Sequence, residues 1–203
     1  MHMVCLDLEG VLVPEIWINF AEKTGIEELR LTTREVPDYD VLMKGRLAIL
    51  KERGLTLSDI QGVIGTLSPL EGALEFLNTL RQKTQVVILS DTFTEFAKPL
   101  MEKLGWPSIF CNSLVVDDAD MIVGYTLRQQ DGKRKAVQAL QGIGFTVFAA
   151  GDSYNDLTMI KTADSGALFR APERIRKEEP QLPHAVTYAD FGSIIDKFLE
   201  NQH

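Results

Sequence analysis

The chain has few of the features that would assign it at once to a common class. It contains two cysteines, Cys5 and Cys111, in 203 residues, which excludes a disulfide framework or a cysteine-based metal cluster. No stretch approaches the roughly 18 consecutive apolar residues of a membrane span. The start, MHMVCLDLEG, reaches acidic residues too early for a signal peptide. These absences predict a cytoplasmic protein without a membrane partner.

Positive charge is also scarce. The chain has 21 Lys and Arg residues against 29 Asp and Glu residues, a formal net charge of −8. A nucleic-acid-binding chain normally carries a basic face, so we expect no nucleic-acid partner. Neither a Gly-x-Gly-x-x-Gly after the first apolar run nor a Gly-x-x-x-x-Gly-Lys-Ser/Thr is present. Their absence disfavours a dinucleotide-dependent oxidoreductase and a P-loop kinase.

What the sequence does contain is a series of short apolar runs that end in polar residues. Runs at 3–8, 85–90 and 146–150 are typical of strands buried on both faces, and weaker runs follow at 165–169 and 185–188. Helical patterns lie between them. This alternation predicts an α/β fold with a doubly wound parallel sheet.

The long segment between the first two runs departs from this alternation. Residues 14–68 hold three helical patterns, which is more than one crossover needs. We therefore expect a core of residues 1–13 and 69–203, with residues 14–68 forming a small helical cap inserted after the first strand.

Two further local features have structural consequences. Residues 114–127 are typical of a β-hairpin with its turn at 117–120. A helical pattern over 92–104 contains Pro99 near its middle, which predicts a kink or a break there.

Polar residues follow three of the apolar runs, and we expect them to meet, because open α/β sheets bind ligands beyond the carboxyl ends of their strands. In chain order these side chains, with a lysine from a following helix, are Asp7, Glu9, Ser90, Asp91, Lys133, Asp152 and Asp156. Carboxylate oxygens suit Mg²⁺, and helix N-termini favour an anion. The combination predicts a site for Mg²⁺ and a phosphate group.

Each of these residues also has a plain structural explanation. The Asp7–Glu9 pair fits a simple turn, Asp152 or Ser153 fits a helix N-cap, and Lys133 fits a solvated helix surface. Their occurrence together, in this order and each at a strand end, favours the phosphate site.

The motifs together resemble those of the haloacid dehalogenase superfamily of phosphotransferases. They are Asp7-Leu8-Glu9-Gly10-Val11, Ser90, Lys133 and Gly151-Asp152-Ser153-Tyr154-Asn155-Asp156, and the similarity runs from about residue 3 to residue 173. Within the superfamily the chain is most similar to phosphoserine phosphatases with a helical cap. Glu15 and Arg46 match the residues that hold the amino and carboxylate groups of phosphoserine in that family.

Two departures narrow the resemblance. Glu9 stands where ordinary members have a second Asp, and Ser90-Asp91-Thr92 stands where they have Ser-Gly-Gly. The stretch 7–17 instead resembles a bacterial subgroup of bifunctional phosphoserine phosphatase/homoserine phosphotransferases. The resemblance implies phosphoserine and homoserine as small-molecule substrates, and it leaves open whether water or homoserine is the preferred acceptor.

The resemblance also implies how the reaction would run. Asp7 would attack phosphorus and carry an aspartyl phosphate, and Glu9 would act first as general acid and then as general base. Mg²⁺ would bind Asp7, Asp152 and the backbone carbonyl of Glu9, with Asp156 behind it or reaching it through water.

Ser90, Lys133 and Asn155 would bind the phosphoryl oxygens, with Lys135 as the alternative to Lys133. Asp91 would either bind a substrate ammonium or cap the next helix.

The cap residues keep alternatives too. Glu15 fits the first turn of a helix, and Arg46 fits a solvated cap surface. Trp17, Phe20 and Met43 either line the cleft between cap and core or belong to the hydrophobic core.

Two other functions remain open from the sequence. One is the same chemistry on another small phosphate ester, which cap residues would decide. The other is a phosphorylated switch of the response-regulator type, which fits less well because such domains are shorter, lack a helical insertion and carry the phosphorylated Asp on a middle strand. A homodimer is compatible with the sequence, which does not settle the oligomeric state.

Overall fold

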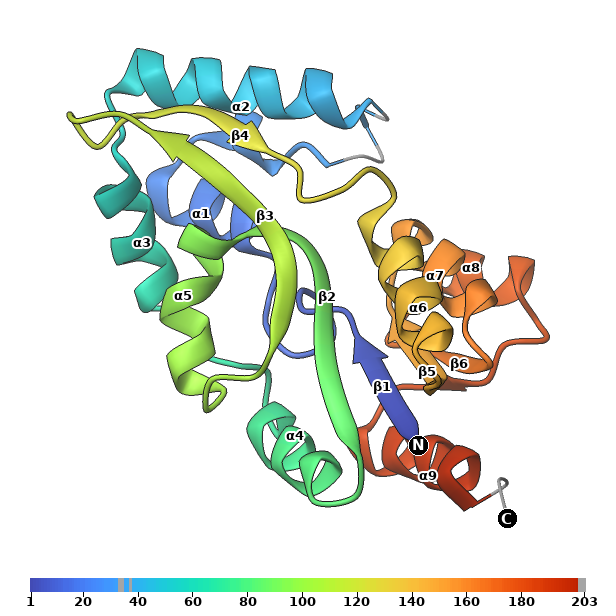
Figure 1. Ribbon diagram of the computed structural model, residues 1–203. Helices are drawn as coiled ribbons and strands as arrows, with labels where there is room; N and C mark the ends of the chain where they lie inside the picture. The colour runs from blue at the N-terminus through green and yellow to red at the C-terminus, as the bar shows by residue number, and fades with distance from the viewer. Residues whose placement is uncertain (33–34, 37, 201–203) are drawn as a thin grey trace.

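The computed structural model describes residues 1–32, 35–36 and 38–200 (Figure 1). A seven-stranded sheet has the order β4-β3-β2-β1-β5-β6-β7. The strands are β1 His2–Leu6, β2 Gln85–Phe93, β3 Ile109–Val116, β4 Ile122–Thr126, β5 Thr146–Gly151, β6 Ser165–Phe169 and β7 His184–Ala185. Every neighbouring pair is parallel except β3 and β4. The predicted α/β fold with a mostly parallel sheet is confirmed.

Helices cover both faces of the sheet. Helices α4 (Ala73–Arg81), α5 (Thr94–Lys103) and α9 (Tyr188–Glu200) pack on the face that holds Val4 and Leu6. Helices α6 (Gly132–Gly142), α7 (Leu157–Thr162) and α8 (Glu173–Glu178) pack on the face that holds Cys5. Alternate residues of β1 thus feed two separate hydrophobic cores, as a strand buried on both faces requires. None of the helices in the described ranges has the length and apolar character that crossing a bilayer would need.

The segment after β1 forms helices α1 (Ile16–Thr24), η1 (Glu27–Arg30), α2 (Tyr39–Arg53) and α3 (Leu57–Gly65). Helices α1 and α2 lie beyond the arrowhead of β1, next to the β3–β4 hairpin (Figure 1). The Asp38 carboxylate caps α2 by accepting from two backbone N–H groups, and Thr56 and Asp59 form a capping box at α3. Phe20 and Met43 are fully buried and join the same hydrophobic core as α4, α5 and α9, so these two residues belong to the core.

The predicted hairpin is present and contacts helices α2 and α3. Strand β3 pairs parallel with β2 through Ile109 before it turns into the antiparallel pair with β4, so it begins earlier than the pattern suggested. At the hairpin tip, the Asp120 backbone oxygen accepts from Leu57 N and its carboxylate accepts from Ser58 N, both at 2.8 Å. Asp120 therefore caps α3 from outside the helix.

Helix α5 runs unbroken through Pro99, and the predicted break is wrong. Proline cannot donate a backbone N–H to the carbonyl four residues earlier, which here belongs to Glu95. The Gln61 side chain of α3 donates to that carbonyl at 2.8 Å instead. The amide supplies the partner that proline removes, and the helix continues.

Candidate active site

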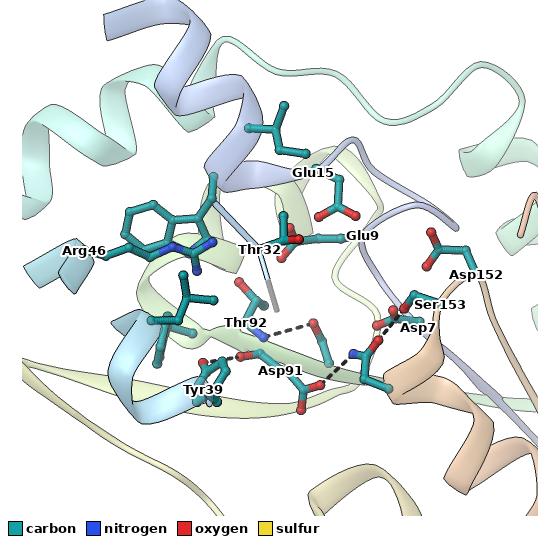
Figure 2. A pocket seen from close by; sticks show the side chains of 16 residues that line it. Asp7, Glu9, Glu15, Thr32, Tyr39, Arg46, Asp91, Thr92, Asp152 and Ser153 are labelled. Carbon is teal, nitrogen blue, oxygen red and sulfur yellow. Dashed lines mark hydrogen bonds between the residues drawn. The ribbon is translucent and has the colours of Figure 1, made fainter. Parts of the chain in front are cut away.

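A cavity of about 160 Å³ lies between the carboxyl ends of β1, β2 and β5 and the helices α1 and α2 (Figure 2). It collects most of the site residues expected from the sequence, namely Asp7, Glu9, Glu15, Arg46, Ser90, Asp91, Asp152 and Asn155. Lys133 and Asp156 lie directly behind its floor, where Lys133 contacts Asp7. The topology therefore brings together the polar ends of three strands, as the sheet-edge argument predicted.

The loop after β1 is shaped by a close approach of two chain segments. Asp7 N donates to Ala150 O at 2.9 Å, which extends the pairing of β1 with β5 by one residue. Gly10 follows with φ +76°, and a Cβ atom there would lie 2.4 Å from the Asp152 carboxylate. Only glycine fits this position, because both the backbone conformation and the space exclude a side chain. Gly10 thus lets the carboxylates of Asp7 and Asp152 sit side by side.

Lys133 places a buried ammonium among carboxylates. Its Nζ lies 2.9 Å from Asp7 Oδ1 and 2.7 Å from Asp156 Oδ1, with Asp91 Oδ2 at 3.7 Å. Burial alone would lower the pKa of Lys133, but these carboxylates outweigh it and raise the pKa well above its usual range. Lys133 therefore stays charged beside Asp7, whereas Lys135 forms no ion pair with these carboxylates in the described part of the chain.

Asp156 is fully buried and organises the loop after β5. One oxygen accepts from Lys133, and the other accepts from the backbone N–H groups of Asp152 and Ser153 at 3.1 and 3.0 Å. A Cβ atom on Gly151 would lie 2.2 Å from the Asp156 carboxyl carbon, so glycine is required for this approach. Asp156 fixes the direction of Asp152 and of the Lys133 ammonium.

Among the residues that the structure describes, the carboxylates of Asp7, Asp152 and Asp156 form the one cluster suited to a cation. One oxygen of each lies within 4.8 Å of the others. Burial, together with Asp156, raises the pKa of Asp7 above its usual range, and burial, Asp156 and Glu15 raise the pKa of Asp152 to about 7. A bound divalent cation would offset this repulsion, and an all-oxygen donor set fits a hard ion such as Mg²⁺.

Glu9 is oriented by the start of helix α1. Its Oε2 accepts from Ile16 N at 2.8 Å, and Figure 2 shows its carboxylate beside that of Glu15. Burial and the Glu15 carboxylate raise the pKa of Glu9 to about 8, against an opposing effect of Arg46. The acid form of Glu9 therefore persists to higher pH than that of an ordinary carboxyl group. Glu15 makes no side-chain cap on α1.

Arg46 is buried in the wall opposite the acidic cluster, so its assignment to a solvated surface is wrong. The side chain is 7% exposed, its Nη2 donates to Leu31 O at 2.7 Å, and its guanidinium lies 4.4 Å above the Trp17 ring. Its Nε has no hydrogen-bond partner within the described chain. A buried donor without a partner favours a ligand at this position.

Asp91 does not cap helix α5, because β2 continues through Phe93 and the helix begins only at Thr94. Its carboxylate instead accepts from Asn155 Nδ2 at 2.9 Å. The Ser90 hydroxyl, one residue earlier, accepts from Thr92 N at 3.2 Å. Figure 2 shows both bonds at the lower edge of the cavity.

Sequence reasoning missed several lining residues, which are Ile18, Thr32, Tyr39, Leu42, Thr92, Phe93 and Ser153. Trp17 also lines the cavity, as one of its two sequence interpretations suggested. The Tyr39 hydroxyl donates to Asp91 O at 3.3 Å. Tyr39 lies two helical turns before Arg46, so the helical period of α2 carried a signal that could have placed both on one face.

Residues 1–164 match the family model of haloacid dehalogenase-like hydrolases. The chain belongs to this family. Because members of this family are hydrolases, the chain is an enzyme. This excludes the alternative of a phosphorylated switch of the response-regulator type.

Similar proteins support the assignment over nearly the whole length of this haloacid dehalogenase-like hydrolase. Phosphoserine phosphatase ThrH of Pseudomonas aeruginosa is 61% identical over 94% of this chain and 93% of its own length. A phosphoserine phosphatase of Pseudomonas syringae is 60% identical over 93% of this chain and 79% of its own length. A crystal structure of an apo phosphoserine phosphatase shares the fold, with a TM-score of 0.72 at 24% identity over 88% of this chain and 90% of that one.

Proposed function

We propose that this enzyme is a Mg²⁺-dependent phosphoserine phosphatase that also transfers the phosphoryl group of phosphoserine to homoserine. The observation that carries the proposal is the arrangement in one cavity of Asp7, of Glu9 with its raised pKa, and of the pair Glu15 and Arg46. The name of the relative with 61% identity supports the substrate.

In the first half of the reaction, an Asp7 carboxylate oxygen attacks phosphorus, forming the O–P bond of an aspartyl phosphate while the bond to the serine oxygen breaks. Glu9 gives its proton to the departing serine oxygen. Lys133 and the Ser90 hydroxyl donate to the phosphoryl oxygens, with Asn155 beside them. Mg²⁺, held by Asp7, Asp152 and the Glu9 carbonyl, would supply positive charge against the repulsion between two anions.

In the second half, the ionised Glu9 takes a proton from the acceptor hydroxyl, whose oxygen forms the new bond to phosphorus and releases Asp7. Water as acceptor yields inorganic phosphate, and homoserine yields phosphohomoserine. Both outcomes use the same residues, so the acceptor that occupies the cavity decides the product.

Amino-acid recognition is assigned to one residue that directly precedes α1 and one on α2. The Glu15 carboxylate would hold the substrate ammonium, and the buried Arg46 guanidinium would hold the substrate carboxylate through its unpaired donor. Asp91, 47% exposed at the side chain, is a second candidate for the ammonium. Phosphate esters without an amino-acid head would leave Arg46 unpaired, which favours phosphoserine over a phosphosugar.

We further infer that residues 14–68 act as a cap that shields the aspartyl phosphate from bulk water. A shielded site favours an acceptor that fits the cavity over water. Homoserine is one methylene longer than serine. The Glu9 side chain is likewise one methylene longer than the Asp of ordinary members, so its carboxylate reaches differently over the phosphorus, which is a reason for a different choice of acceptor.

The deciding experiment incubates the enzyme with phosphoserine and Mg²⁺, with and without homoserine, and quantifies serine, inorganic phosphate and phosphohomoserine. We expect serine release in both reactions, and phosphohomoserine at the expense of phosphate when homoserine is present. Phosphate alone would restrict the enzyme to hydrolysis. No serine release would overturn the substrate assignment.

Replacing Arg46 tests the carboxylate clamp. We expect Arg46→Ala to raise the KM for phosphoserine far more than it lowers kcat, because the guanidinium binds a part of the substrate that does not react. Steady-state kinetics with phosphoserine would measure both constants. An unchanged KM would remove Arg46 from the binding site.

A further inference from the structure

A second cavity, of about 400 Å³, adjoins the active site on the side away from α1. Its walls are the carboxyl end of β2, the first half of β3, the 127–131 loop, and the starts of α6 and α7. It shares Tyr39, Ser90, Asp91 and Asn155 with the first cavity. The phosphoryl-binding end of the active site is thus bordered by two cavities, of which only the first lies under α1.

The second cavity reaches the buried end of the active site. Lys133, whose ammonium contacts the nucleophile Asp7, lines it together with Gly132 at the start of the 11-residue helix α6. Arg128 lies at its outer wall and donates to Gly132 O at 3.0 Å. An anion leaving the Lys133 ammonium would therefore meet a second cation, Arg128, on its way to solvent.

The two cavities differ in charge. The first has five acidic residues in its lining, Asp7, Glu9, Glu15, Asp91 and Asp152, and Arg46 as its basic residue among the described ones. The second has two acidic residues, Asp91 and Asp131, and two basic residues, Lys133 and Arg128. A phosphate dianion that departs under α1 must pass the Glu15 carboxylate, whereas the two acidic and two basic residues of the second cavity offset one another.

Side chains that line both cavities separate one cavity from the other. Among them are Asn155 and Asp91, joined by a hydrogen bond of 2.9 Å from Asn155 Nδ2 to Asp91 Oδ2. Both residues are exposed, and exposed side chains change rotamer on a picosecond-to-nanosecond timescale. Rotation of these two side chains would join the cavities without any movement of the cap.

We propose that the second cavity is the route by which inorganic phosphate enters and leaves the active site, separate from the path under α1 that amino acids use. The inference rests on the proposed function for the identity of the anion. It assigns a role to Arg128, Asp91 and Asn155 in product release. Serine leaves under the cap, and phosphate leaves past α6.

Narrowing each path separately tests the proposal. Thr158, exposed on α7, lines only the second cavity of the two, and Ile18 on α1 lines only the first. Thr158→Trp would narrow the second cavity, and Thr158→Ser is the control for side-chain size. Ile18→Trp would narrow the first cavity in the same way. Gln130→Trp would narrow the second cavity from the opposite wall if Thr158→Trp fails to fold.

The probe is inorganic phosphate with the Mg²⁺-loaded enzyme. Magnetisation transfer in ³¹P NMR gives its rates of binding and release, and kcat/KM for phosphoserine reports entry under the cap. We expect Thr158→Trp to slow both phosphate rates about tenfold, equivalent to about 1.4 kcal/mol of added barrier. The phosphate Kd and kcat/KM for phosphoserine should stay unchanged, and Ile18→Trp should give the reverse pattern.

Unchanged phosphate rates in Thr158→Trp and Gln130→Trp would overturn the route, as would equal slowing of phosphate and phosphoserine. If the variants slow only the binding or release of serine or homoserine, the second cavity is a path for amino acids, and the phosphate route is overturned. If the wild-type enzyme does not turn over phosphoserine, the proposed function fails. The phosphate measurements would still decide the route.

Discussion

At the scale of single residues, Lys133 connects the proposed nucleophile Asp7 with Asp156, the residue that organises the loop after β5. Its ammonium contacts the nucleophile Asp7, and it contacts Asp156, which holds the loop that carries Asp152. One buried cation therefore stabilises two buried carboxylates that would otherwise repel each other. Removing one partner of a buried ion pair leaves the other charge uncompensated.

Lys133→Met should affect both activity and stability. We expect hydrolysis of phosphoserine to fall about 10²–10³-fold, as for loss of one donor to a developing charge. The free energy of unfolding should fall by about 3–5 kcal/mol, because Asp7 and Asp156 lose their cation. Steady-state kinetics with Mg²⁺ would measure the loss of activity, and urea unfolding without Mg²⁺ would measure the loss of stability. Lys135→Met is the matched control, and a loss of activity there instead would reverse the lysine assignment.

Glu9 and Glu15 make activity depend on pH. The pKa of Glu9 is raised to about 8, chiefly by burial and next by Glu15, so the acid form prevails below that pH and is lost above it. We expect kcat/KM for phosphoserine to decline above about pH 8. Glu15→Gln removes a neighbouring carboxylate, lowers the pKa of Glu9 and moves the decline to lower pH.

Asp196→Asn is the control for Glu15→Gln. It also removes one carboxylate, but Asp196 lies on α9, where it pairs with Lys83 at 2.8 Å, so the pH profile should stay in place. A decline that stays in place in Glu15→Gln would show that another group titrates.

The apolar runs located Asp7, Ser90 and Asp152, whereas Glu15 and Arg46 were expected from the family resemblance. Asp7, Ser90 and Asp152 meet because parallel strands end at one edge, which the apolar runs alone predict. Tyr39 shares a helical face with Arg46, so the helical period of α2 could have placed it. Thr32 was missed because its position depends on how the segment before α2 packs over the sheet. That packing is set by tertiary contacts such as the Arg46 guanidinium on the Trp17 ring, which no local pattern encodes.

At the scale of elements, helix α5 and helix α3 are joined where proline would otherwise weaken the structure. The carbonyl of Glu95 loses its helical partner at Pro99 and accepts from Gln61. Sequence rules predicted the lost bond correctly and the break wrongly, because the replacement donor lies far away in the chain. The start of α5 was misplaced for a similar reason, since a register shift in the β2–β3 pair between Leu89 and Phe93 lets β2 continue.

Gln61→Ala should destabilise the protein by about 1 kcal/mol, the net value of one hydrogen bond. In a Pro99→Ala background the same change should have a smaller effect, because residue 99 then donates its own N–H to Glu95 O. Urea unfolding of the two single variants and the double variant forms the thermodynamic cycle. Additive effects would mean that Gln61 does not replace the missing bond.

At the scale of the whole molecule, the β3–β4 hairpin connects the sheet to the helices over the active site. Tyr125 on β4 donates its hydroxyl to Asp40 on α2 at 2.6 Å, and Asp120 caps α3. The helices that cover the cavity are thus held at the start of α2 and at the start of α3 by one extension of the sheet. Loosening this attachment should admit water to the aspartyl phosphate.

Tyr125→Phe should lower the ratio of phosphohomoserine to inorganic phosphate by about two- to tenfold, the range that a net hydrogen bond of about 0.5–1.5 kcal/mol allows. Product analysis at fixed homoserine would measure the ratio. Tyr154→Phe removes a hydroxyl that bonds Glu178 at 2.7 Å on the surface, away from the hairpin, and should change this ratio less. An equal effect of both variants would mean that the hairpin does not control the acceptor.

The place of β1 at the middle of the sheet has a consequence for synthesis on the ribosome. It is made before both of its neighbours, β2 and β5, and β5 begins only at Thr146. Translation proceeds at about 5–20 residues per second, so the strand before Asp7 waits seconds for its second partner. Until then its apolar side chains lack half of their packing, which makes the N-terminal segment of the nascent chain a natural target for chaperones.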